Sequence, residues 1–181
     1  GRTLAYPYFA RRLLTAVGAP FSVAIAVHGH DAKTHDAVTR SPGSFAQTIA
    51  GLRNVFRYRR PGQEIEIRIV LHKRTAQHLE PTLDYLLKAF PDARLYRMSL
   101  IHLEMEGQAE RNFESIRLSL GDCVAHIEDS LETLGRFHDF RLYHFPLCVL
   151  PPGLRARARR PLPKSDVRFL RKCRSCCVRK S

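Results

Sequence analysis

The sequence predicts an α/β protein with a parallel sheet, organised as a partial (β/α) barrel followed by an irregular, cysteine-containing C-terminal extension. Short apolar segments rich in β-branched residues alternate with longer amphipathic segments. Amphipathic segments of this length are typical of the helices that connect parallel strands. The four expected strands are fewer than a closed barrel needs, so the sheet is expected to be part of a larger barrel.

The N-terminal half contains two helical and two strand patterns. Residues 7–17 have helical apolar spacing, and residues 21–27 form a short apolar run typical of a buried strand. Residues 44–59 repeat apolar side chains every three or four positions and predict a helix with Ser44 as its N-cap. Residues 64–72 are rich in Ile and predict a second strand.

The C-terminal half repeats the alternation once more and then loses it. Residues 79–90 predict a helix that Pro91-Asp92 stops, and residues 94–104 predict a third strand. Residues 120–134 predict another helix, and residues 140–145 a fourth strand. From Pro151 onward the pattern predicts irregular chain.

The positive charge of this chain is concentrated at its C-terminal end. The chain has 181 residues and a net charge of +13, and residues 154–181 carry eleven Lys or Arg against one acidic residue. We place a boundary inside the chain, with residues 1–139 as the partial barrel and residues 140–181 as the extension. No window approaches the roughly 18 apolar residues of a membrane helix, so no membrane partner is expected.

The cysteines favour a metal site and a reducing compartment. Cys123 lies in a helical pattern and is expected to be a buried small hydrophobe. Cys148, Cys173 and Cys176 lie in the C-terminal stretch, and the C-x-x-C spacing lets one turn aim two thiolates at one metal centre. This clustering resembles a metal site more than a disulfide framework, so we expect a cytoplasmic protein.

Ionisable residues gather where the predicted strands end. His28 follows the first strand, and Glu104 lies at the end of the third. Ligands of parallel α/β sheets bind at the carboxyl ends of strands, which makes these positions candidate binding residues. Arg68 lies inside the second strand and needs a partner, such as a ligand carboxylate or Glu104.

Three segments carry a resemblance to radical S-adenosylmethionine (SAM) enzymes. Residues 28–45, with His28-Gly29, His35-Asp36 and the Gly43-Ser44-Phe45 that opens a helix, resemble the fourth-strand region of that family. Residues 66–73 resemble its fifth strand. Residues 147–151 and the C-x-x-C-x-V-R of residues 173–179 are similar to the C-terminal auxiliary-cluster region of His-Xaa-Ser-type peptide maturases.

The resemblance implies a fold, an activity and a set of cofactors. It implies the back half of a radical SAM barrel with a truncated auxiliary-cluster extension, which uses SAM and [4Fe–4S] clusters to generate a 5′-deoxyadenosyl radical. It also implies a peptide or protein substrate and a reductant such as flavodoxin or ferredoxin. Ala26 stands where the family has a Ser thought to touch the SAM ribose. The residues that the resemblance places toward SAM or substrate are Ala26, His28, Arg68 and Glu104, and Cys148, Cys173 and Cys176 are its auxiliary-cluster ligands.

The same resemblance implies that this chain is a fragment, inactive by itself. The C-x-x-x-C-x-x-C loop that holds the catalytic cluster is not in the sequence and would precede Gly1. The fourth auxiliary ligand would fall one residue after Ser181. Missing barrel neighbours would leave residues 21–27 as an unpaired apolar edge.

Two alternatives stay open. A zinc-dependent hydrolase of amidohydrolase type would use His28, His30, His72 and His102 at strand ends, although the last predicted strand does not end in the Asp that such sites need. A basic zinc-ribbon-like protein that binds nucleic acid would use the C-x-x-C and the basic tail. The chain has no second C-x-x-C, so nucleic acid is not the expected partner.

Overall fold

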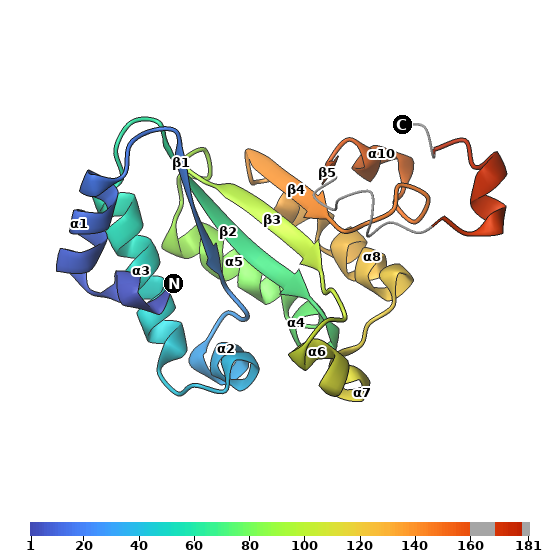
Figure 1. The fold of residues 1–181 in the computed structure, drawn as a ribbon, viewed down its shortest axis with the longest axis horizontal. Helices are drawn as coiled ribbons and strands as arrows, with labels where there is room; N and C mark the ends of the chain where they lie inside the picture. The colour runs from blue at the N-terminus through green and yellow to red at the C-terminus, as the bar shows by residue number, and fades with distance from the viewer. Residues whose placement is uncertain (160–168, 179–181) are drawn as a thin grey trace.

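Five parallel strands in sequential order form the sheet of this protein, in a computed structural model that describes residues 1–159 and 169–178 (Figure 1). Each strand pairs in parallel with the next along the chain. The predicted α/β class with a parallel sheet is therefore confirmed. The strands are β1 (Phe21–Ala26), β2 (Gln63–Leu71), β3 (Arg97–His102), β4 (Asp139–Tyr143) and β5 (Ala158–Arg159).

Helices connect the strands and lie mainly behind the sheet in the view of Figure 1. The longer ones, α3, α5 and α8, follow β1, β2 and β3 and cover one face. The helices that connect strands or precede the sheet are η1 (Arg2–Ala5), α1 (Pro7–Ala16), α2 (Ala32–Thr39), α3 (Ser44–Tyr58), α4 (Lys73–Ala76), α5 (Leu79–Ala89), α6 (Gln108–Arg111), α7 (Phe113–Ile116), α8 (Leu120–Asp129) and α9 (Leu131–Leu134). The C-terminal region adds α10 (Pro152–Arg155) and η3 (Arg171–Ser175). None of the helices in the described part of the chain is long and apolar enough to cross a membrane.

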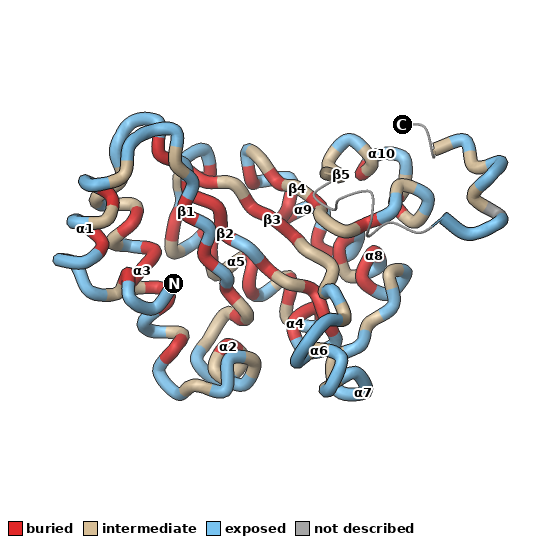
Figure 2. The backbone as a smooth tube through the Cα atoms, viewed as in Figure 1, coloured by how far each residue is buried: buried red, intermediate tan, exposed pale blue. Residues whose placement is uncertain are grey.

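The hydrophobic core lies between the sheet and these helices. Alternate residues of β1 and β4 are buried, as the period of two along a strand requires, whereas β3 buries three consecutive residues (Figure 2). In β2 the buried row is Ile65, Ile67, Ile69 and Leu71, and it packs in one cluster with apolar side chains of α3, α5 and α8. These interleaved Ile, Val and Leu side chains are the reason that the four predicted strands form where the sequence indicates them.

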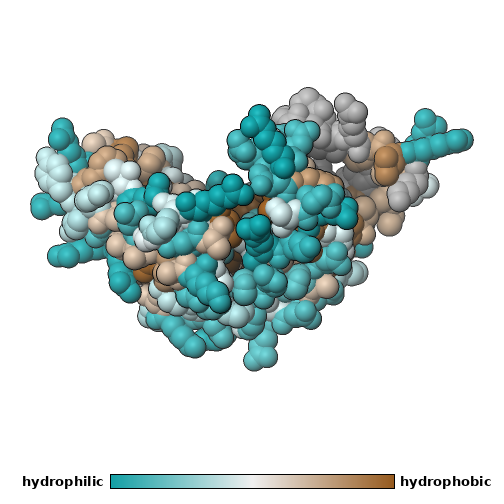
Figure 3. Space-filling model, turned by 90° about the horizontal axis from the view of Figure 1, so that it is seen from below, coloured by the Kyte–Doolittle hydropathy of each residue, from teal (hydrophilic) through white to brown (hydrophobic). Residues whose placement is uncertain are grey.

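No helix of the described residues covers the opposite face of the sheet (Figure 1). Its rows contain Ala24 and Ala26 from β1 and Glu64 and Arg68 from β2, all of which are exposed. Purely parallel sheets are almost always covered on both faces. One uncovered, polar face is therefore the feature of this fold that most needs a functional explanation. In the space-filling view from below, the outline is hollowed along its upper side, where this face lies (Figure 3).

β1 forms one edge of the sheet, because among the described residues it pairs only with β2. None of its six residues is charged. Natural edge strands commonly carry charges that prevent pairing with another chain. The expected unpaired apolar edge is thus present in the structure.

Several elements differ from the sequence-based expectation. The expected helix over 120–134 ends at Asp129, and α9 starts again after Ser130. The region expected to be irregular after Pro151 contains α10 and β5, and β5 extends the sheet beyond β4. β5 has two residues, too short for any periodicity to show. The boundary placed after residue 139 falls at the first residue of β4, and the sheet continues across it.

The start of α3 is also capped differently from the prediction. Gly43, with a φ of 80°, holds the N-cap position, and Ser44 is the first helical residue. The capping acceptor is Asp36 of α2, a helix that the sequence analysis did not identify. Its carboxylate accepts hydrogen bonds from the Gly43 amide (2.7 Å), the Phe45 amide (2.8 Å) and the Ser44 hydroxyl (2.7 Å). These bonds explain why Asp36 has a lowered pKa, with the Ser44 bond as the largest cause.

Candidate functional site

The strand register aligns charged side chains across the uncovered face. In one row, Ala24, Glu66, Arg97 and Asp139 stand side by side on four neighbouring strands. In the next row toward the C-terminal edge, Ala26, Arg68, Ser99 and Arg141 do the same. The sign of the charge therefore alternates across the first row, from Glu66 to Arg97 to Asp139.

Arg97 connects three strands. Its guanidinium donates to Glu64 of β2 at 3.1 Å and to Asp139 of β4 at 3.1 Å. The Arg97 side chain is 20% exposed and that of Asp139 is 31% exposed, so this ion pair is partly shielded from water, whereas Glu64 is 61% exposed. A shielded guanidinium needs such partners, because a buried charge without them is costly.

Two further ion pairs run along single strands. Arg68 binds the Glu66 carboxylate through Nε at 2.9 Å and Nη2 at 3.2 Å. Arg141 binds Asp139 at 2.9 Å. Arg68 was expected to need a partner such as a ligand carboxylate or Glu104; in the structure the partner is Glu66, because residues two apart on a strand share one face, and a ligand carboxylate stays a prediction. The Arg68 side chain is still 46% exposed and can contact a ligand.

The carboxylates of this face stay ionised. Burial acts to raise the pKa of Glu66, but the hydrogen bond from Arg68 and the nearby positive charges outweigh it, so the pKa lies below its ordinary value. The same balance, with Arg141 and Arg97 as partners, lowers the pKa of Asp139. The face therefore presents fixed charges of both signs at neutral pH.

A cluster of histidines lies at the C-terminal ends of β1 and β2. The His28 amide donates to His35 Nδ1 at 3.2 Å, and the two rings lie 5.3 Å apart. Burial first, and then the charges of His35 and His72, lower the pKa of His28 to about 4. Burial first, and then Arg74, lower the pKa of His72 to about 4. Both imidazoles are neutral at pH 7.

The two histidines of the loop after β1, His28 and His30, pack against different partners. His28 packs on His35, whereas the ring of His30 lies 5.7 Å from that of His78. Nδ1 of His28 is buried and has no hydrogen-bond partner among the described residues. In the parts of the chain that the structure describes, no group of three or more His, Cys, Asp or Glu side chains could hold a metal ion. The histidine set of the hydrolase alternative is thus not assembled there.

The predicted SAM- or substrate-facing residues occupy two different places. Ala26 is the last residue of β1, and Ala26 and Arg68 are register partners on the uncovered face. His28 lies beyond the end of β1, in the histidine cluster. Glu104 lies after β3 and is 3.5 Å from His144 Nδ1 rather than near Arg68.

The predicted cluster ligands do not converge within residues 1–159 and 169–178. Cys148 is exposed in the turn after β4, Cys173 lies in η3 and Cys176 follows it, and these three do not form a metal-binding group there. The auxiliary cluster stays a prediction. The expectation for Cys123 is confirmed, because it is buried in α8 and burial raises its thiol pKa to about 12. Basic-tail residues Arg160, Lys164, Arg168, Arg179 and Lys180 lie outside the described residues.

Sequence reasoning missed most of the charged face. It identified Arg68 but not Glu66, Arg97, Asp139 or Arg141. The signal was available, because charged residues recur at every second position of these strands, at 64, 66 and 68 and at 139 and 141. That period of two indicates one polar face.

Comparison with protein-family models, with curated proteins and with solved structures finds no match to this chain. The candidate site is therefore interpreted from its own geometry and from the resemblance stated above.

Proposed function

We propose that this chain is part of a radical SAM barrel enzyme that modifies a peptide, and that the uncovered face of its sheet lines the substrate cavity. The observation that carries the proposal is the sheet itself, which is parallel, sequential in order, covered by helices on one face and lined by ion pairs on the other. In a barrel, the face opposite the helices points into the interior. Charged side chains there need partners, and a polar ligand can provide them.

The residues present fit SAM in part. SAM carries an ammonium, a carboxylate and ribose hydroxyls, and the face offers the Glu66 carboxylate and the Arg68 guanidinium near the middle of β2. Ala26 presents a small side chain there, and the buried Nδ1 of His28 lacks a partner among the residues described. When bound and reductively cleaved, SAM supplies the 5′-deoxyadenosyl radical that abstracts hydrogen from substrate.

Each charged group has a role that follows from its exposure and pairing. Arg68 is half exposed and already oriented by Glu66, so it can bind a carboxylate of SAM or of the peptide without losing its orientation. Arg97 and Asp139 are more shielded and hold the strands and Arg141 in position. The described cysteines do not fit an assembled cluster, so no step is assigned to them. Flavodoxin or ferredoxin remains the proposed reductant.

Equilibrium dialysis with SAM tests the proposal on the 181-residue chain. We expect saturable binding that Ala26→Phe weakens by about 10-fold or more, because a ring at position 26 would occupy the face beside Arg68. Ala125→Phe, at an exposed position of α8, is the matched control and should bind SAM as the unchanged chain does. Absence of SAM binding, or equal loss in both variants, would contradict the proposal.

Metal analysis after anaerobic reconstitution separates this proposal from the zinc-based alternatives. Iron and sulfide bound through Cys148, Cys173 or Cys176 would support the radical SAM assignment. Stoichiometric zinc lost on His28→Asn would support the hydrolase, and zinc lost on Cys173→Ser would support the zinc-ribbon protein.

A further inference from the structure

A cleft with a volume of about 460 Å³ opens at the C-terminal edge of the sheet, away from the uncovered face. It is bordered by the end of α2, by the β2–α4 junction, by Leu103 after β3, and by α6 and α7. Figure 3 views the molecule from this edge, which is mostly hydrophilic. Cavities of this volume accommodate small-molecule ligands, and strand carboxyl ends are where parallel α/β sheets bind them.

Two arginines line the cleft without acidic partners. Arg40 lies at the end of α2 on one side, and Arg74 lies in α4 on another. Neither guanidinium is paired with a carboxylate in the described part of the chain, although six other described arginines form ion pairs with an acid at 2.9–3.6 Å. None of the residues that line the cleft is Asp or Glu.

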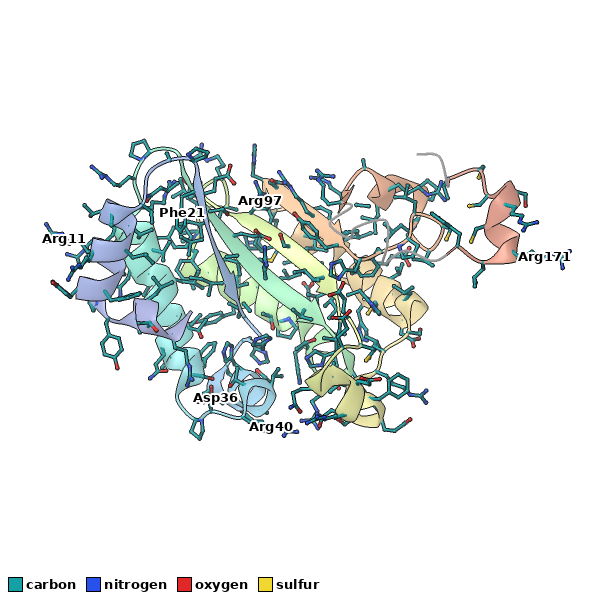
Figure 4. The ribbon with its side chains drawn as sticks, viewed as in Figure 1. Arg11, Phe21, Asp36, Arg40, Arg97 and Arg171 are labelled. Atoms are coloured by element: carbon teal, nitrogen blue, oxygen red, sulfur yellow. The ribbon has the colours of Figure 1, made fainter. Side chains whose placement is uncertain are left out.

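The backbone at Arg40 is held in a left-handed conformation. Its φ is 53° and its ψ is 34°, a region that non-glycine residues rarely adopt and that costs them energy. Its Nη2 donates to Asn112 Oδ1 across the cleft at 3.2 Å, which ties the end of α2 to α7. Figure 4 shows Arg40 at the lower edge of the molecule, below α2. Arg40 is thus held at the mouth of the cleft.

The other polar groups of the cleft can donate hydrogen bonds. His72 Nδ1 accepts from the Arg74 amide at 3.2 Å, so the neutral ring carries its proton on Nε2. The side chain of Gln108 adds amide donors to the lining. Asn112 Nδ2 donates one N–H to the Gln108 carbonyl at 2.7 Å and keeps its second N–H, whereas the Ser115 hydroxyl already donates to the Asn112 carbonyl at 2.9 Å. A cleft with two cationic groups and no acid has a positive potential and favours an anion.

We propose that this cleft binds the phosphate group of a small-molecule ligand, with Arg40 and Arg74 on either side of the anion. Guanidinium groups bind phosphate oxygens through two parallel hydrogen bonds, which gives both affinity and orientation. The site shares no residue with the uncovered face, so it stands whether or not the chain binds SAM.

Isothermal titration with pyrophosphate, inorganic phosphate and citrate at 0.15 M salt tests the site on the 181-residue chain. We expect Arg40→Asn and Arg74→Gln each to weaken binding of the phosphate probes by about 10-fold or more, because each removes charge-assisted hydrogen bonds. Asn suits the left-handed backbone at position 40, so this variant keeps the fold while removing the charge. Pyrophosphate or phosphate bound more tightly than citrate would identify phosphate as the ligand group.

Arg11→Gln is the matched control. Arg11 is an exposed arginine of α1 at the left end of the molecule in Figure 4 and does not line the cleft, so its loss reports how much binding comes from the net positive charge alone. Equal affinity of the Arg40, Arg74 and Arg11 variants would overturn the proposal, as would tighter binding of citrate than of either phosphate probe. Ala26→Phe should leave phosphate binding unchanged, so failure of the SAM assignment can be told apart from failure of this one.

Discussion

Gly29 determines how closely the histidine loop can pack against α2. A Cβ built at Gly29 would overlap the Thr34 side chain and lie 2.9 Å from the His35 amide. Thr34 has no freedom to move away, because its amide and hydroxyl both donate to Asp31 Oδ1 at 2.8 Å. The close approach of loop and helix therefore depends on the missing side chain.

We expect Gly29→Ala to lower the free energy of unfolding by about 1–3 kcal/mol, the usual cost of forcing extra atoms into a packed site. Urea denaturation measures it. Gly153→Ala is the matched control, since nothing lies within 4 Å of a Cβ at that position, and it should leave stability unchanged. A Gly29→Ala protein as stable as the control would show that the loop can move away from α2.

At the scale of single residues, the sequence identified Arg68 but neither its partner nor the other charged residues of the uncovered face. The expected importance of Arg68 is consistent with its place on the uncovered face, but its partner is Glu66 rather than Glu104. Likewise the cap of α3 comes from Asp36 rather than from Ser44. Glu66 and Asp36 both lie within ten residues of the groups that they bind. The sequence alone does not show which nearby carboxylate accepts the bond, because that depends on where α2 and the third strand end in space.

Among the elements, β2, β3 and β4 are held together on their uncovered face by Arg97. Its two ion pairs, to Glu64 and Asp139, cross from the central strand to both neighbours. Apolar side chains cannot do this on a face that lacks a covering helix. The ion pairs thus take the place that a second layer of helices has in most parallel sheets.

Arg97→Met should destabilise the protein by about 1–3 kcal/mol, because it removes a partly shielded guanidinium that bridges Glu64 and Asp139 on the two neighbouring strands. The control is Arg94→Met, which removes an ion pair with Asp92 from a side chain that is 77% exposed and should change stability by less than about 0.5 kcal/mol. Chemical denaturation of both variants at one salt concentration makes the comparison. Equal losses would mean that the cross-strand geometry contributes nothing.

The sequence predicted the longer helices and strands better than the short ones. Helices α1, α3 and α5 and the first four strands agree with the apolar periodicity to within a few residues, because each buries a regular row of side chains. α2 was missed because only His35 of its residues is buried, so it has almost no apolar stripe. β5 was missed because a strand of two residues is too short to show an alternation of apolar and polar side chains.

The whole molecule has an acid-sensitive edge, because His28 and His72 are neutral in the fold and lie where β1 and β2 end. The pKa of each is lowered from 6.5 to about 4, chiefly by burial, and burial also lowers the pKa of His35 and His102. In the unfolded chain these imidazoles take up protons near pH 6.5. The unfolded state therefore binds more protons than the folded state between about pH 6.5 and pH 4. Stability is full above this range and falls as the pH drops through it.

We expect the free energy of unfolding to fall by on the order of 3 kcal/mol between about pH 7 and pH 5, which urea titrations at several pH values measure. This range lies above the pH at which the carboxylates of the uncovered face take up protons, so the histidines account for the change. His28→Asn removes one of the two most strongly shifted groups and should flatten the dependence by roughly half, whereas the exposed His138→Asn is the surface control. A stability that stays level from pH 7 to pH 5 would mean that the strand ends are open to water.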